Sequence, residues 1–229
     1  MTYTALHSWD LTPTEARALQ AKLAERLVLA DRVGAQPRLV AGIDCAYAGR
    51  GAETVAHAAV VVVQIPELEV VESRHASVAV RFPYVPGLLS FREAPAALAA
   101  LSKVEQAPGL LMLDGQGLAH PRRLGLACHL GVLTGVPSIG CAKSRLIGAY
   151  EEPGGDRGCW SPLTVGADRV GAVLRTRPGH RPLFVSQGHL VSLERAVDLV
   201  LYCCREGQFL PEPTRLAHLA AARIARPVS

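Results

Sequence analysis

Residues 38 to 44 read Arg-Leu-Val-Ala-Gly-Ile-Asp, a run of strand-forming residues that reaches an acid. An acid inside such a hydrophobic strand must be paired, protonated or bound to a cation. The segment Leu110-Leu111-Met112-Leu113-Asp114 repeats the arrangement. In α/β sheets, ligands usually bind at the carboxyl ends of strands. Either aspartate alone can be a satisfied structural residue. If the two strands are neighbours, however, both carboxylates converge on one site for a hard cation, and Mg²⁺ prefers such ligands.

Extended and helical segments follow one another on both sides of these two strands. Leu39 to Tyr47, Val55 to Gln64 and Val70 to Val80 are rich in Val, Ile or Ala and predict an antiparallel meander. The remaining pattern predicts helices at Phe91 to Lys103, Leu124 to Thr134, Leu193 to Cys204 and Pro211 through Ile224, buried strands at Leu110 to Leu113 and Ser138 to Ala142, and a hairpin of Val170 to Leu174 with Leu183 to Val185. The sequence therefore predicts an α/β fold, a mixed β-sheet flanked by helices.

Two further segments bear on the organisation of the chain. Thr12-Pro13-Thr14-Glu15 is typical of a helix start, because Thr12 and Glu15 can form a capping box, and the helix is expected to continue to about Val33. Gly148 to Asp168 carries Pro, Gly and mixed charges without a period, which predicts a surface excursion and not a domain boundary. A length of 229 residues fits one domain, residues 1–229.

Composition narrows the class of protein without identifying it. A net charge of +4 is compatible with a polyanionic partner but is also common in proteins that never bind nucleic acid. The six cysteines show no C-x-x-C spacing and are expected to be small buried hydrophobes. The chain shows no signal-like N-terminus and no apolar run long enough to span a bilayer. We therefore expect a cytoplasmic protein with no membrane partner.

Basic residues lie close to the predicted acidic site. The segment from Asp114 to Arg123 follows a strand and precedes a helix, so its glycines allow close backbone approach and its basic end can meet phosphate. Arg122 and Arg123 can equally be a solvated helix start. Lys143 follows the strand Ser138 to Ala142 and lies at the same edge as Asp114 if the sheet is parallel there. A lysine in that place can neutralise phosphate, although lysines at strand ends are common on protein surfaces.

An aromatic residue stands between two prolines in Pro83-Tyr84-Val85-Pro86-Gly87. The prolines stiffen the loop, so the ring either points outwards, where it can stack on a base, or packs under the loop. Glu93 begins the helix that follows, where an acid is also simply favourable to the helix dipole.

Taken together, these motifs resemble the endonuclease V family, whose fold is similar to that of ribonuclease H. The resemblance runs across almost the whole chain. It rests on Val40-Ala41-Gly42-Ile43-Asp44, on the segment from Pro83 to Glu93, on Asp114-Gly115-Gln116-Gly117 with His120-Pro121-Arg122-Arg123, on Gly140-Cys141-Ala142-Lys143-Ser144, on Gly188-His189, and on Pro211-Glu212-Pro213-Thr214-Arg215. The sequence departs from the family pattern at Gln187, where a proline is frequent, and at Cys45 and Cys141, which occupy small-residue positions.

The resemblance implies roles for individual residues. It makes Asp44 and Asp114 metal ligands, Glu93 a third acid of the site, and Lys143 a contact to the phosphate or leaving group. The family's final acidic-or-histidine position falls on His218, for which a satisfied helix histidine is the alternative. The remaining implied roles concern nucleic acid: Tyr84 as a wedge in the duplex, Gly87, Leu89 and Gly115 as the lining of a pocket for a flipped base, and His120 and Arg122 as further contacts.

The resemblance also implies a reaction. Members of the family use Mg²⁺, for which Mn²⁺ can substitute, to hydrolyse the second phosphodiester bond 3′ to deoxyinosine and leave a 5′-phosphate and a 3′-hydroxyl. The expected partner is therefore DNA that contains deoxyinosine, bound by a monomer.

Three other functions compete with this one. Some relatives prefer inosine in single-stranded RNA, and the sequence shows no clear reader of the 2′-hydroxyl. A non-catalytic nucleic-acid-binding protein of the same fold would be expected to lack at least one of Asp44, Glu93 and Asp114, and all three are present. A serine hydrolase of the nucleophile-elbow type is not supported, because the chain has no Gly-x-Ser-x-Gly segment.

Overall fold

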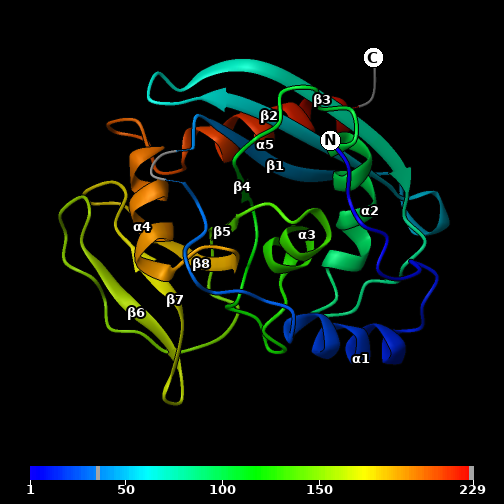
Figure 1. The fold of residues 1–229 in the computed structure, drawn as a ribbon, viewed down its shortest axis with the longest axis horizontal. Coiled ribbons are helices and arrows are strands. Elements are labelled where there is room, and N and C mark those ends of the chain that lie inside the picture. Colours follow the sequence, from blue (N-terminus) through cyan, green and yellow to red (C-terminus); the bar gives the residue numbers. More distant parts are fainter. Residues whose placement is uncertain (35–36, 227–229) are drawn as a thin grey trace.

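An eight-stranded sheet forms the centre of the computed structural model, which describes residues 1–34 and 37–226 (Figure 1). The strand order is β3-β2-β1-β4-β5-β8-β7-β6. The strands are β1 (Leu39–Ala48), β2 (Val55–Gln64), β3 (Glu69–Ala79), β4 (Leu110–Leu113), β5 (Ser138–Ala142), β6 (Trp160–Val165), β7 (Asp168–Leu174) and β8 (Leu183–His189). The helices are α1 (Pro13–Ala24), α2 (Ser90–Leu101), α3 (Leu126–Thr134), α4 (Leu193–Tyr202) and α5 (Glu212–Ala225), with a short 3-10 turn at Gly51–Glu53.

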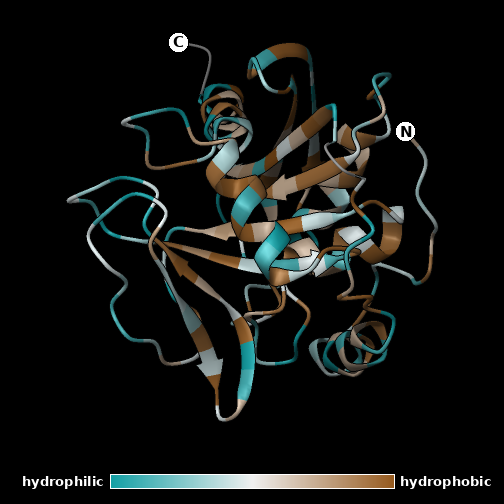
Figure 2. Ribbon diagram, turned by 60° about the vertical axis from the view of Figure 1, so that its left-hand side comes forward, coloured by the Kyte–Doolittle hydropathy of each residue, from teal (hydrophilic) through white to brown (hydrophobic). Residues whose placement is uncertain are grey.

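Strands β1, β4 and β5 run parallel, and the other neighbours are antiparallel. The predicted mixed α/β sheet and its antiparallel meander β1–β2–β3 are thus confirmed. Helices cover both faces of the sheet, so its central strands are buried on both sides. These apolar strands lie between the helices in Figure 2. This explains the unbroken apolar sequence of β4: Leu110 and Met112 pack in the cluster with α4 and α5, while Leu111 and Leu113 pack with α2 and α3.

Helix α5 lies directly on β1, and the contact depends on one glycine. A Cβ atom on Gly42 would lie 1.9 Å from the carbonyl oxygen of Pro213, in the first turn of α5. Because no side chain intervenes, the helix axis can run close to the strand and carry His218 over Asp44. Close packing of α5 on β1 therefore requires glycine at position 42, independently of the strand propensity of its neighbours.

Two expectations about the secondary structure were wrong. The first helix ends at Ala24, not near Val33. Beyond it the chain is irregular, and its backbone groups bond to Leu190, just after β8: Leu190 N–H donates to the Val28 carbonyl oxygen at 2.6 Å, and Arg32 N–H donates to the Leu190 carbonyl oxygen at 2.9 Å. These partners lie about 160 residues away in sequence, so helical periodicity could not reveal them.

The predicted surface excursion from Gly148 to Asp168 contains a strand, β6, which pairs with β7. It is an edge strand in which Leu163 alone is fully buried, and Pro162 interrupts its pattern. A half-exposed edge strand with a proline gives little periodic signal. The predicted hairpin is confirmed as β7 with β8. None of the described helices has both the length and the apolar character that crossing a membrane requires.

Substitution of Gly42 by Ala should destabilise the protein, because the added methyl group would overlap the Pro213 carbonyl and push α5 away from β1. Overpacking of this kind typically lowers the free energy of unfolding by about 1–3 kcal/mol. Denaturant unfolding of Gly42→Ala beside Gly155→Ala tests it, since a Cβ on Gly155 meets no atom within 4 Å. Equal unfolding midpoints for the two variants would refute the close-packing role.

Candidate active site

Two aspartates lie side by side on neighbouring parallel strands. The pairing of β1 with β4 sets Ile43 opposite Leu113, so Asp44 and Asp114 follow at the same level of the sheet. Asp114 N–H donates to the Ile43 carbonyl oxygen at 3.0 Å, which fixes the end of β4 against β1. The two side chains are only 12% and 14% exposed. The expected adjacency of the two acid-bearing strands is therefore confirmed.

Helix α5 adds a histidine to this pair. His218 Nδ1 lies 2.7 Å from Asp44 Oδ2 and 4.0 Å from Asp114 Oδ2. One ligand atom each from Asp44, Asp114 and His218 can be chosen so that all three lie within 4.8 Å of one another. Two carboxylates suit a hard divalent cation such as Mg²⁺ or Mn²⁺, whereas imidazole is the less typical ligand for these ions. The donor set thus fits a cation held mainly by the aspartates, with His218 beside it.

Burial and like charge perturb the acids of the site. The pKa of Asp44 is raised by burial and by the neighbouring charge of Asp114. The pKa of Glu93 is raised to about 8, first by burial and then by the charge of Asp44. Three carboxyl groups held this close repel one another when ionised unless positive charge lies among them. This electrostatic state is what a cation would relieve.

Lys143 supplies one positive charge. It follows β5, which runs parallel to β4, and its Nζ forms an ion pair with Asp114 Oδ2. The sequence-based expectation that Lys143 lies at the same sheet edge as Asp114 is confirmed. An ammonium group in this place can also donate to a phosphate oxygen, because a lysine has three N–H donors.

Glu93 is buried beside the aspartates but outside their group of potential ligand atoms. It lies in the first turn of α2 and is 7% exposed. Its Oε1 accepts a hydrogen bond from the Tyr47 hydroxyl at 3.1 Å. The guanidinium of Arg92 lies over the rings of both Tyr47, at 5.3 Å, and Tyr84, at 5.9 Å. Tyr47 was not singled out in the sequence, where it looks like an ordinary strand residue.

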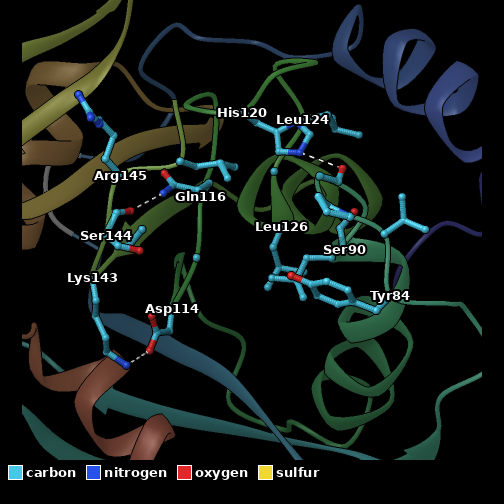
Figure 3. A pocket seen from close by; sticks show the side chains of 18 residues that line it. Tyr84, Ser90, Asp114, Gln116, His120, Leu124, Leu126, Lys143, Ser144 and Arg145 are labelled. Atoms are coloured by element: carbon cyan, nitrogen blue, oxygen red, sulfur yellow. Dashed lines mark hydrogen bonds and ion pairs between the residues drawn. The ribbon is translucent and has the colours of Figure 1, made fainter. Parts of the chain in front are cut away.

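A pocket of about 450 Å³ opens next to Asp114. Figure 3 shows two walls, one with Asp114, Lys143 and Ser144 and the other with Tyr84, Ser90 and Leu126. The complete lining is Tyr84, Val85, Pro86, Gly87, Leu89, Ser90, Asp114, Gly115, Gln116, His120, Leu124, Gly125, Leu126, Ala142, Lys143, Ser144, Arg145 and Leu146. The three residues that the resemblance implied as a pocket lining, Gly87, Leu89 and Gly115, are among them.

The carbonyl oxygen of Gly87 is held by three side chains. Gln20 Nε2 and Arg122 Nη2 donate to it at 3.1 Å and 2.7 Å, and His120 Nε2 lies 3.0 Å away. Burial lowers the pKa of His120 to about 4, with a smaller contribution from the charge of Arg122, so this ring is neutral and donates through Nε2–H. His120 and Arg122 thus support the Pro83–Gly87 loop, and their contact with nucleic acid stays a prediction. Gln20 lies far away in the sequence and gave no signal.

Tyr84 points away from the loop that carries it. Tyr84 is 75% exposed, so packing under the loop, the alternative for this residue, is wrong. Gly87 has a φ of +77°, a backbone conformation that residues other than glycine rarely adopt. The loop is therefore fixed at Gly87 by its hydrogen bonds and presents Tyr84 at the rim of the pocket.

Comparison with known proteins covers nearly the full chain. A family model described as endonuclease V matches residues 21–219. The endonuclease V of Roseiflexus castenholzii is 50% identical over 217 residues, which span 95% of this chain and 95% of that protein.

Solved structures give the same result. The crystal structure of endonuclease V from Streptomyces avermitilis has a TM-score of 0.88 at 46% identity and covers 95% of this chain and 94% of that chain. Endonuclease V of Ciona intestinalis, in complex with a 24mer DNA that contains an inosine followed by a ribo-adenosine, has a TM-score of 0.79 at 28% identity and covers 92% of this chain and 96% of that chain.

Proposed function

Because the chain belongs to the endonuclease V family, we propose that it is a DNA-repair nuclease that cuts the second phosphodiester bond 3′ to deoxyinosine, leaving a 5′-phosphate and a 3′-hydroxyl. Its mixed sheet with flanking helices is the ribonuclease H-like fold of endonuclease V structures. The observation that carries the proposal is the convergence of Asp44, Asp114 and His218 beside a pocket large enough for one base. We assign catalysis to one domain, residues 1–229, acting as a monomer.

The chemistry needs an activated water, a neutralised phosphate and a stabilised leaving oxygen. Asp44 and Asp114 would hold Mg²⁺, or Mn²⁺ in its place, and the ion supplies Lewis-acid stabilisation of the phosphate charge. Lys143 leaves its ion pair with Asp114 or shares it, and places its ammonium where the transition state gains negative charge. His218 is placed to take a proton from the attacking water.

Glu93 has a different place in this scheme. Burial raises the pKa of its carboxyl group to about 8, which favours the protonated form, and in that form the group, hydrogen-bonded to Tyr47, does not repel the aspartates. Positive charge bound by Asp44 and Asp114 would lower its pKa and release an ionised carboxylate as the third acid of the site. Glu93 would thus add a third ionised carboxylate to the site only after a cation has bound to the aspartates.

Recognition would use the pocket and Tyr84. A base must leave the stack before its edge can be read, and a mispaired inosine costs less to flip than a normal pair. The pocket lies between Tyr84 and Lys143, so a flipped base in it would bring its own strand past the carboxylates. The exposed Tyr84 ring would fill the gap left in the duplex.

Inosine in single-stranded RNA is the second candidate substrate. The Ciona relative binds DNA in which a ribonucleotide follows the inosine, so a 2′-hydroxyl at that nucleotide is compatible with binding in a relative. Parallel assays of DNA and RNA strands of one sequence rank the two substrates.

Strands with and without a single inosine, end-labelled and incubated in Mg²⁺ or in chelator, test the proposal. We expect cleavage only of the inosine strand and only with Mg²⁺, and the product length identifies the bond. Asp114→Asn should still bind the strand but cleave on the order of a hundredfold more slowly or worse, because a ligand charge is lost. Asp168→Asn is the control, since Asp168 is an exposed partner of Arg123 and does not line the pocket. Cleavage in chelator, or normal turnover by Asp114→Asn, would disprove the metal-dependent mechanism.

Tyr84→Ala should reduce binding and cleavage of inosine duplexes by roughly tenfold to a hundredfold, because base stacking on an aromatic ring contributes on the order of 1 to 3 kcal/mol. The loss should be smaller on single strands, where less stacking must be replaced. Tyr84→Phe keeps the ring and should stay near the parent. Cleavage rates of the three proteins on both substrates decide it, and an equal loss on both substrates, or a Phe variant as poor as Ala, contradicts the wedge.

A further inference from the structure

A chain of hydrogen bonds runs from the N-terminal segment to the wall of the pocket. Ser90, the first residue of α2, lines the pocket and is 3% exposed. Its Oγ lies 3.1 Å from Nδ1 of His129, a fully buried residue of α3. His129 Nε2 lies 2.8 Å from His7 Nε2, and His7 Nδ1 lies 2.8 Å from the carbonyl oxygen of Ser8. This relay, His7–His129–Ser90, has no part in the proposed cleavage chemistry.

The donor and acceptor in each hydrogen bond of the relay can be assigned by starting from the bond between His7 and the Ser8 carbonyl oxygen. A carbonyl oxygen can only accept, so His7 Nδ1 carries a proton toward Ser8, and when this is the only proton of the ring its Nε2 is an acceptor. His129 Nε2 must then donate to it. Burial, with a smaller contribution from His7, lowers the pKa of His129 to about 3, so this ring has only one proton and its Nδ1 is an acceptor. The Ser90 hydroxyl therefore donates its hydrogen to His129.

The surrounding rings keep this arrangement in place. His7 lies 4.5 Å from Trp9 between ring centroids, and His129 lies 5.4 Å from Trp9 and 5.2 Å from Phe91. Aromatic contacts on several sides hold both imidazoles in orientation. The relay is thus a fixed element of the core, and the only hydrogen-bonding capacity that Ser90 Oγ has left is to accept.

We propose that Ser90 is a specificity-determining residue, whose hydroxyl oxygen accepts the N1–H of a 6-oxopurine in the pocket and faces the lone pair of adenine N1 unfavourably. Hypoxanthine carries a hydrogen at N1, whereas adenine carries a lone pair there, so an oxygen that can only accept distinguishes the two. His129 and His7 are positioning residues that hold the Ser90 proton away from the base. The inference rests on the proposed function and names the group that reads the deaminated edge.

Gln116, on the wall opposite Ser90, also has an acceptor oxygen without a partner among the described residues. Gln116 donates through Nε2 to the Ser144 carbonyl oxygen at 2.9 Å, and this bond fixes its amide. Gln116 Oε1 is buried and has no hydrogen-bond partner within the described part of the chain. An unpartnered buried acceptor is costly unless a ligand supplies a donor. The Ser90 oxygen therefore favours a base edge that carries an N–H group. A site built to receive a donor strongly rejects an analogue that lacks it.

The first test compares the affinities of two single strands, one with deoxyinosine and one with purine deoxyribonucleoside, which has neither the 6-oxo group nor the N1 hydrogen. Ser90→Ala should lower the preference for deoxyinosine by about three- to tenfold, the usual worth of one neutral hydrogen bond. The loss should fall on the deoxyinosine strand alone. Ser102→Ala, at the other end of α2, where the hydroxyl bonds the Ala99 carbonyl, is the matched control. Ser90→Thr keeps the hydroxyl and should keep the preference.

The outcomes distinguish a failure of the proposed function from a failure of the role assigned to Ser90. A parent protein that shows no preference for deoxyinosine over deoxyadenosine overturns the proposed function. A parent with that preference, together with an unchanged ratio in a folded Ser90→Ala, overturns only the role of Ser90. If Ser90→Ala does not fold, as judged by thermal unfolding, His7→Phe carries the test. It keeps the ring packing and leaves Ser90 intact, yet it frees His129 to reverse, so the preference should still fall.

The second test reads the relay without any substrate. Nitrogen-15 NMR of the histidine rings should show His129 as the Nε2–H tautomer in the parent and a shift toward Nδ1–H in His7→Phe. An Nδ1–H tautomer in the parent would mean that Ser90 can donate to the pocket, which contradicts the proposal. An unchanged base preference in His7→Phe would show that His7 has a packing role only.

Discussion

Asp44 and Asp114 are held side by side by the parallel pairing of β1 with β4, and their mutual repulsion is the constraint on which the rest of the site depends. Two largely buried carboxylates cannot both ionise cheaply unless positive charge lies among them. Lys143, directly after β5, supplies a positive charge beside Asp114, and His218 from α5 lies against Asp44. A divalent cation would complete this balance, and the same positive charge could then act on a phosphate.

The fold supplies each partner by a different physical device. The register of β1, β4 and β5 brings Lys143 to the same edge as the aspartates. The absence of a side chain at Gly42 lets α5 approach β1 and bring His218 over Asp44. Hydrogen bonds to the Gly87 carbonyl hold the loop that bears Tyr84, and the buried His129 orients Ser90 from behind the pocket. The charge of Lys143, the close approach of α5 and the orientation of Tyr84 and Ser90 thus depend on separate elements that meet at one edge of the sheet.

The sequence predicted those parts of the site that have a local signature. Asp44 and Asp114 stand out because an acid directly after an apolar run of strand-forming residues is unusual, and Lys143 follows from strand order. Gln20, Tyr47 and the relay could not be predicted, because their partners are distant in sequence and their residue types are ordinary. The end of α1 and the strand β6 were misjudged for related reasons: distant backbone partners in one case and an irregular, exposed edge in the other.

The most direct test of the central claim is a titration of the protein with Mn²⁺, followed by the electron paramagnetic resonance of the free ion. We predict saturable binding to the parent that Mg²⁺ displaces, unchanged binding to Asp168→Asn, and affinity at least about tenfold weaker in both Asp44→Asn and Asp114→Asn, since each removes a ligand charge. Parent-like binding of Mn²⁺ by both aspartate variants would contradict the claim that these two carboxylates converge on one cation.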